Sequence, residues 1–199
     1  FVVTVSLLQT ASVFFYSLLE ALLAVTGSAP ESKDMGHVLS RTSKGNMDYF
    51  GITDKADETI DLWVANEEKH SDMMQPFDGI PELLAALKNA GCQLGIVTSR
   101  THEEMDLVLD PLPISAYFSV CICSDDTEEH KPSPAPLLKY MEETGAGRDE
   151  ILYVGDSLGD AKCASSAGVD FAHAVWGARE DAHIQAQYYP DGPADLSPT

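Results

Sequence analysis

Residues 151–168 read ILYVGDSLGDAKCASSAG and contain the clearest structural signal in the chain. The largely apolar run Ile151–Gly155 is typical of a buried strand, and the polar turn after it leads into a helix predicted over Gly159–Ala167. Gly168 is placed to end that helix. A strand followed directly by a helix is the unit from which parallel sheets are built, because parallel strands require a crossover connection.

The same alternation continues on both sides of this stretch. The segment Thr101–Glu104 forms a capping-box pattern that predicts a helix start, and Pro136–Thr144 is a further predicted helix. We therefore predict an α/β fold with a Rossmann-like parallel sheet and helices on both faces. The other predicted strands are Phe1–Val5, Gln93–Thr98, Phe118–Cys123 and Val169–Val175.

The segment between the first strand and Pro76 has a different pattern. It contains no run typical of a buried strand, and its apolar residues recur at helical spacing, as in Lys55–His70. We predict an α/β core made of residues 1–12 and 76–199, interrupted by an inserted α-helical cap subdomain over residues 13–75.

The composition excludes several classes of protein. Among 199 residues there are 12 Lys and Arg against 32 Asp and Glu, a formal net charge of −20. A surface this acidic is repelled by nucleic acid and by anionic lipid, so we expect neither as a partner. A phosphorylated ligand would need a cation or a local Lys or Arg. At 44% hydrophobic and 22% charged, the chain is expected to fold into an ordinary globular core.

Two further features bear on where the protein works. The uncharged stretch Phe1–Leu19 is interrupted by polar residues and has no basic residues before it, so we expect a strand and a helix rather than a signal peptide or membrane span. The cysteines form no C-x-x-C pair and have no His nearby at metal-ligand spacing, which predicts buried thiols and a reducing, cytoplasmic setting. Two of them share one face of a predicted strand and could form a two-thiol site, but their apolar surroundings favour a place in the core. The four cysteines are Cys92, Cys121, Cys123 and Cys163.

Two carboxylates follow the strand in residues 151–155. Ligands of open α/β sheets bind beyond the carboxyl ends of the strands, which is where Asp156 and Asp160 are expected. Carboxylate oxygens suit Mg²⁺, which combines one or two of them with waters and substrate phosphate oxygens. The sequence therefore predicts a Mg²⁺ site at Asp156 and Asp160.

Polar residues also follow the two preceding strands. Thr98 and Ser99 offer a hydroxyl and exposed amides for a phosphoryl oxygen, and Arg100 comes next. Lys131 follows the strand that ends at Cys123 and would supply positive charge. Each residue alone is explained by an ordinary turn or loop. Their order after successive strands instead favours a pocket for phosphoryl transfer, with Ser99 and Arg100 expected to bind substrate.

Three segments resemble the second, third and fourth motifs of the haloacid dehalogenase superfamily, most closely its phosphoglycolate-phosphatase-like members. They are Leu94–Arg100, His130–Pro134 and Tyr153–Gly168. The resemblance implies that Thr98 binds the phosphoryl group and that Lys131 stabilises the nucleophile and the intermediate. It also implies that Asp156 and Asp160 anchor Mg²⁺, so the expected catalytic residues are Thr98, Lys131 and Asp156.

The first motif of that superfamily, Asp-x-Asp-Gly-Thr, is where the chain departs from the pattern. The first Asp of the motif attacks phosphorus and the second acts as general acid and base. Counting back from the cap, these slots fall on Val2 and Thr4, and neither side chain can replace a carboxylate. The aspartates are either absent from the protein or hidden by an incomplete or misread N-terminus, since the chain begins with Phe1 at the motif.

These observations support two functional hypotheses. The first is a Mg²⁺-dependent phosphatase of small phosphorylated metabolites, which in its intact form uses an aspartyl-phosphate. The second is a catalytically inactive relative that binds phosphate or a phosphometabolite, for which Val2 and Thr4 are genuine. Phosphomutase or dehalogenase chemistry on the same core would need the same missing aspartate.

Overall fold

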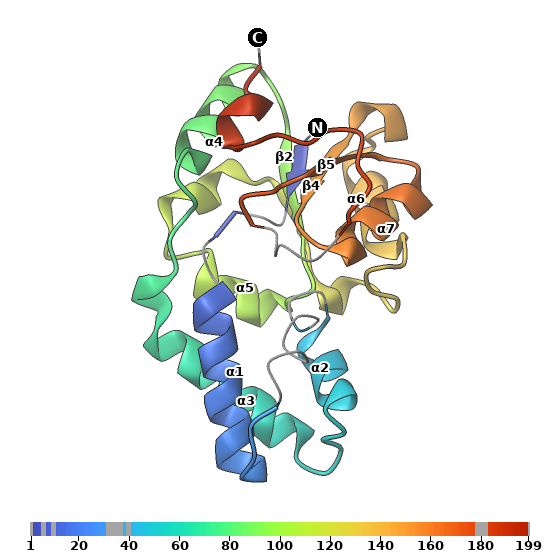
Figure 1. The fold of residues 1–199 in the computed structure, drawn as a ribbon. Coiled ribbons are helices and arrows are strands. Elements are labelled where there is room, and N and C mark those ends of the chain that lie inside the picture. The colour runs from blue at the N-terminus through green and yellow to red at the C-terminus, as the bar shows by residue number, and fades with distance from the viewer. Residues whose placement is uncertain are drawn as a thin grey trace.

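The computed structural model confirms the predicted α/β fold. Five parallel strands form one sheet in the order β3-β2-β1-β4-β5 (Figure 1). The strands are β1 (Val2–Thr4), β2 (Leu94–Val97), β3 (Val120–Ile122), β4 (Leu152–Gly155) and β5 (Asp170–His173). The structure describes residues 2–4, 7–8, 11–30, 38, 41–177 and 183–198.

Helices cover both faces of this sheet. On one face, α4 (Ile80–Asn89) and α5 (His102–Val108) pack apolar side chains onto β2, including Leu84 and Leu87 against Leu94. On the other face, α6 (Ala135–Thr144) and α7 (Leu158–Ala167) enclose a second core. The described part of the chain also contains the short 3₁₀ helices η2 (Ser71–Met73), η3 (Pro113–Tyr117), η4 (Ser124–Asp126), η5 (Arg148–Glu150) and η6 (Pro193–Leu196).

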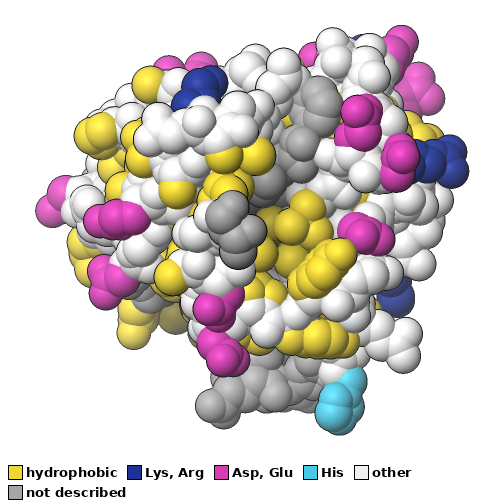
Figure 2. Space-filling view, turned by 90° about the horizontal axis from the view of Figure 1, so that it is seen from above, with side chains coloured by type: hydrophobic (Ala, Val, Ile, Leu, Met, Phe, Trp, Pro, Cys, Tyr) yellow, Lys and Arg dark blue, Asp and Glu magenta, His cyan; other side chains and the backbone are white. Residues whose placement is uncertain are grey.

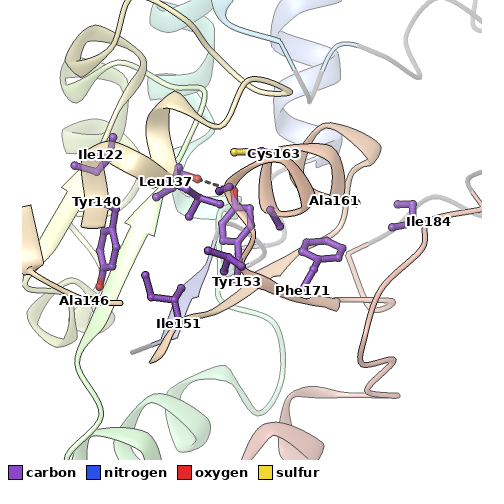
Figure 3. Packing of buried hydrophobic residues seen from close by; sticks show 14 residues of the cluster. Ile122, Leu137, Tyr140, Ala146, Ile151, Tyr153, Ala161, Cys163, Phe171 and Ile184 are labelled. Carbon is purple, nitrogen blue, oxygen red and sulfur yellow. Dashed lines mark hydrogen bonds between the residues drawn. The ribbon is translucent and has the colours of Figure 1, made fainter. Parts of the chain in front are cut away.

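Aromatic side chains fill the core beneath α6 and α7 (Figure 3). Tyr153 of β4 lies beside Phe171 of β5, with ring centroids 6.0 Å apart. Tyr140 of α6 is fully buried over β2, at a position where β2 carries Gly95. A Cβ atom at Gly95 would lie 2.2 Å from the Tyr140 ring, so only glycine allows the helix to approach this closely.

The predicted helix starts agree with the structure where the side chains form caps. Thr101 and Glu104 make the expected capping box at α5. Ser157 and Asp160 make a second one at α7, so the turn after β4 is held by reciprocal hydrogen bonds. Gly168 ends α7 in the left-handed conformation, as predicted.

Three helices form an insert between β1 and α4. They are α1 (Ala11–Thr26), α2 (Ser43–Tyr49) and α3 (Ala56–Lys69), and they lie together below the sheet in Figure 1. Phe14 and Trp63 meet edge to face in their shared core, with ring centroids 4.6 Å apart. Among the described residues, no helix is both long and apolar enough to cross a membrane.

The two ends of the insert meet at its junction with the sheet. An antiparallel bridge joins Leu8 to Pro76, and the Phe77 amide donates to the Leu7 carbonyl at 3.0 Å. α1 begins at Ala11, two residues before the boundary predicted at residue 13. Figure 2 shows the end of the molecule away from the insert, where hydrophobic side chains gather near the centre of the face and acidic ones are scattered toward its margin.

Candidate functional site

A buried network surrounds Asp160 at the start of α7. Lys131 donates from Nζ to Asp160 Oδ1 at 2.7 Å, and the two side chains are 6% and 1% exposed. The Tyr153 hydroxyl lies 3.0 Å from the same oxygen. Ser157 donates to Asp160 Oδ2 from its hydroxyl at 2.6 Å and from its amide at 3.1 Å. The carboxylate therefore holds Lys131 in one position.

The electrostatics keep Asp160 ionised. Burial by itself would raise the pKa of this carboxyl, but the charge and hydrogen bond of Lys131, with the hydrogen bonds from Ser157 and Tyr153, hold the pKa below its usual value. Burial, together with the nearby Asp160 charge, raises the pKa of Tyr153 well above its usual range. Tyr153 therefore remains a neutral hydrogen-bond donor.

Tyr153 also connects two strands of the sheet. Its hydroxyl lies 3.3 Å from the Val97 carbonyl, one residue before Thr98, as well as beside Asp160. This places the end of β2 and the start of α7 at the same rim. Tyr153 and Ser157 were not predicted as site residues: Tyr153 sits within an apolar run, whereas the Ser-x-x-Asp capping pattern could have identified Ser157.

Asp156 follows β4 directly and is half-buried. A Cβ atom at Gly177 would lie 2.7 Å from Asp156 Oδ2, so the turn after β5 packs closely against this carboxylate. We predicted Asp156 and Asp160 as joint metal ligands. In the structure, four donors already approach the two oxygens of Asp160, and a bond to a metal would displace one of them. A carboxylate at Asp156, completed by waters and phosphate oxygens, fits the ligand preference of Mg²⁺.

Thr98 and Ser99 differ in what they can offer an anion. The Thr98 amide donates to the Ile122 carbonyl at 2.9 Å, so it is not the exposed amide that we expected. The Thr98 hydroxyl accepts the Arg100 amide at 3.2 Å and keeps its own proton to donate. The Ser99 hydroxyl is buried and has no hydrogen-bond partner among the described residues, which is the state expected of a donor that awaits a ligand.

Arg100 pairs with the insert. Its guanidinium donates to both carboxylate oxygens of Glu67 in α3, at 2.7 and 3.1 Å, and lies 5.1 Å from the centroid of the Phe14 ring. Burial alone would lower the pKa of Arg100, but Glu67 raises the pKa above its usual value. We predicted that Arg100 binds substrate. In the structure its guanidinium N–H groups instead donate to Glu67 at the junction of the insert and the core. Ser43 of α2 also donates to Glu104 of α5 across the same junction.

The strand register bears on the two slots of the first motif. Val2 pairs with Leu94 and Leu152, and each of these lies four residues before a rim residue, Thr98 or Asp156. At about 3.3 Å per residue, the backbone at Val2 lies about 13 Å short of the rim. The structure therefore does not bring Val2 to Thr98 and Asp156. The side chains of residues 2 and 4 lie outside what the structure describes.

A cavity lies between the insert and the core. It measures about 700 Å³ and is lined from the core side by Thr101, Ser124, Asp125 and His130, the neighbour of Lys131. Thr98 lines a smaller cavity of about 70 Å³. The rim residues thus border the junction, while most of the open volume lies beside them.

Comparison of the sequence with models of known protein families shows the family of this chain. The sequence model of the haloacid dehalogenase-like hydrolase family matches residues 6–174. The chain belongs to this family. The match includes the segments with Thr98, Lys131 and Asp156, and it starts after the positions assigned to the aspartate pair. The resemblance in the three later motifs is thereby confirmed.

Curated relatives of this chain include several phosphatases. The pyrophosphatase PpaX of Bacillus velezensis is 32% identical over 72% of this chain and 67% of its own length. The phosphoglycolate phosphatase of Aquifex aeolicus is 38% identical over 52% of this chain and 48% of its own length. The alignments thus span about half to two thirds of these curated relatives.

Solved structures agree with the fold over nearly the whole chain. A structure from Lactobacillus plantarum, at 27% identity, has a TM-score of 0.87 and covers 98% of this chain and 95% of its own. CbbY of Rhodobacter sphaeroides, solved in complex with phosphate, is 18% identical with a TM-score of 0.85, covering 98% and 94% of the two chains. At this identity the second likeness supports the fold alone.

Proposed function

We propose that the chain is a phosphatase-type hydrolase by descent, built to bind small phosphorylated metabolites at the rim formed by Thr98, Lys131 and Asp156. The observation that carries the proposal is the buried Lys131–Asp160 pair, which fixes a positive charge beside the ends of β2 and β4. The neighbouring Ser99 hydroxyl, buried and unpartnered among the described residues, supports an anionic ligand there. The names of the relatives support pyrophosphate or phosphoglycolate as substrates to test first.

In this proposal each side chain has a separate task. The Thr98 and Ser99 hydroxyls donate hydrogen bonds to phosphoryl oxygens, and the Lys131 ammonium stabilises the charge that develops on them. Asp160 acts as a positioning residue because it holds Lys131. Asp156 would hold Mg²⁺, whose chemistry when bound is to neutralise charge on the phosphate. The helical insert would act as a cap that excludes water from the rim.

The sequence does not supply the carboxylate that would attack phosphorus. Family resemblance places it at Val2 and places the acid/base at Thr4, and neither residue can perform these roles. We therefore expect little turnover of p-nitrophenyl phosphate by the chain, with or without Mg²⁺. Robust Mg²⁺-dependent turnover would refute the placement of the nucleophile.

The experiment that tests this proposal restores the carboxylates. The motif register predicts that Val2→Asp/Thr4→Asp raises Mg²⁺-dependent hydrolysis while the matched Val2→Asn/Thr4→Asn does not, whereas the strand register, which leaves Val2 about 13 Å short of the rim, predicts no gain from either variant. Because the register keeps Val2 short of the rim, the pair Thr4→Asp/Ser6→Asp serves as a second test. If activity rises only in Thr4→Asp/Ser6→Asp, the assignment of the first motif to Val2 and Thr4 is wrong. If activity rises in neither variant although both fold, the result counts against hydrolysis at this rim.

Binding of a phosphate ligand without turnover is the second candidate, favoured by Val2 and Thr4 themselves. Calorimetric titration with inorganic phosphate and with phosphoglycolate would then show binding to the unmodified chain. Thr98→Val, which keeps the shape but removes the hydroxyl, should weaken that binding. Binding that survives in this variant would place the ligand elsewhere.

A further inference from the structure

We propose a second cation site, formed by His102, Cys123, Asp125 and Asp126, that takes a borderline-soft divalent metal such as Zn²⁺. The ring nitrogen, thiol sulfur and carboxylate oxygens of these residues all lie within 4.8 Å of one another. None of the four is assigned to the phosphate-binding rim. The site is therefore independent of the proposed function.

The four ligand atoms lie within reach of one ion, and those up to 4.8 Å apart would move closer to surround it in a tetrahedral site. His102 Nε2 lies 2.8 Å from Asp126 Oδ2, and Cys121 Sγ lies 3.5 Å from Cys123 Sγ. Ligand atoms at about 2.0–2.3 Å from a tetrahedral Zn²⁺ stand about 3.3–3.8 Å apart. Cys123 is buried, whereas Asp125 is exposed and its two carboxylate oxygens accept the His102 amide at 3.2 and 3.3 Å, so one of them would leave that hydrogen bond to reach the ion.

The donor set selects the class of metal. Thiolate and imidazole ligands favour Zn²⁺ and similar transition ions, whereas Mg²⁺ requires oxygen ligands in octahedral geometry. The site therefore differs in metal preference from the carboxylate at Asp156. Cys121 is not one of the four ligands, but its sulfur lies 3.5 Å from that of Cys123, so Cys123→Ser is to be tested in a chain that also carries Cys121→Ser.

The position of the cluster suggests what a bound ion would do. His102 follows the loop that carries Thr98, and Cys123 to Asp126 precede the loop that carries Lys131. The two loops already touch, because the Ser124 amide donates to the Arg100 carbonyl at 2.8 Å. A metal held by both would cross-link them and stabilise the spacing of the rim. Asp125 also lines the 700 Å³ cavity, which gives an ion a path of entry.

Sequence spacing did not reveal this site. We expected no metal-binding cysteine because no His lies near one along the chain, but the fold brings His102 to residues 21 to 24 positions later. The side-chain contact between His102 and Asp126 depends on α5 starting beside the end of β3. That placement is a property of the tertiary structure.

The test is a titration of the whole chain, kept reduced and first freed of metal by a chelator. We expect Co²⁺ to bind in equimolar amount with sulfur-to-cobalt charge-transfer absorption, which Zn²⁺ abolishes and excess Mg²⁺ does not. Cys123→Ser, made together with Cys121→Ser, should lose the charge-transfer band, and His102→Gln should weaken Co²⁺ binding at least about tenfold. The unmodified chain with Zn²⁺ should also unfold at a higher temperature.

Two controls separate this site from its surroundings. Cys92→Ser keeps the four ligands and should bind Co²⁺ unchanged. Asp156→Asn should also leave the titration unchanged, so failure of the phosphate site would not affect the result. The proposal is overturned if the unmodified chain shows no charge-transfer band, if Cys123→Ser retains it, or if Mg²⁺ displaces the ion. If Cys123→Ser does not fold, His102→Gln alone decides, since that side chain is 49% exposed.

Discussion

Replacement of Glu67 by Gln removes the charge that faces Arg100 at the junction of the insert and the core. The two side chains are 5% and 15% exposed, and the guanidinium makes two hydrogen bonds to the carboxylate. At a separation of about 4 Å and an effective dielectric constant of about 20, their attraction is about 4 kcal/mol. Leaving one partner of such a buried pair unmatched costs about 3–5 kcal/mol. Gln keeps one acceptor and Arg100 keeps some contact with water, so we expect a loss of about 3 kcal/mol.

Urea unfolding measures this loss. With a slope of about 2 kcal/mol per M, a loss of about 3 kcal/mol lowers the midpoint by about 1.5 M. Trp63 lies one helical turn before Glu67 in α3 and is buried, so its fluorescence reports on the insert once the second tryptophan, Trp176 of the core, is replaced by Phe. If the insert detaches first, that signal should move to lower urea than the far-ultraviolet circular dichroism.

Glu68→Gln is the matched control because Glu68 is adjacent, acidic and exposed. We expect it to change the free energy of unfolding by less than about 0.5 kcal/mol. The reasoning fails if Glu67→Gln and Glu68→Gln shift the midpoint equally. It also fails if the effects of Glu67→Leu and Arg100→Leu simply add in the double variant, because a coupled pair should lose less than the sum.

Three further changes test other parts of the structure. Lys131→Met should lower the free energy of unfolding at neutral pH by about 3–5 kcal/mol, since it leaves Asp160 charged and buried. Lys131 holds the pKa of Asp160 below its usual value, so the stability from the pair is lost as the pH falls through that lowered pKa; without Lys131, burial raises the pKa of Asp160 and its protonation removes the cost of the buried charge. The deficit should therefore shrink in acid unfolding assays, and a pH-independent deficit would contradict the pairing. Gly95→Ala should lower the free energy of unfolding, measured in urea, by about 1–3 kcal/mol because the added methyl group presses on Tyr140. Tyr140→Leu in the same chain should recover part of this loss. An unchanged urea midpoint for Gly95→Ala would contradict the close contact. Burial lowers the pKa of His173, so the folded state disfavours the protonated ring. The melting temperature should therefore be highest above about pH 6.5 and fall as the pH drops below that value. His173→Gln should reduce this pH dependence.

The predicted elements agree closely with the structure because their signals are local. The strand predicted over Gln93–Thr98 is β2 at Leu94–Val97, and the helix predicted over Gly159–Ala167 is α7 at Leu158–Ala167. Apolar periodicity and caps act over a few residues, so they can be recognised without knowledge of the rest of the chain. Residues 31–37 and 39–40 of the predicted cap lie outside what the structure describes.

The candidate site was predictable only in part. Motif spacing identified Lys131 and Asp160, which the fold joins across 29 residues. It did not indicate that Asp160 would be surrounded by donors, nor that Tyr153 would supply one of them. These contacts depend on how far each side chain reaches across the sheet, which no pattern within a single strand records.

The order of residues by itself determined the alternation of strands and helices and the family, because the signals for both lie in short segments of the chain. Only the tertiary structure decided that Arg100 meets Glu67, 33 residues away, and that His102 meets Asp126, 24 residues away. Both pairings arise where separate segments end at the same edge of the sheet. Their geometry follows from the path of the chain and the burial of charge, which are set by the packing of the whole molecule.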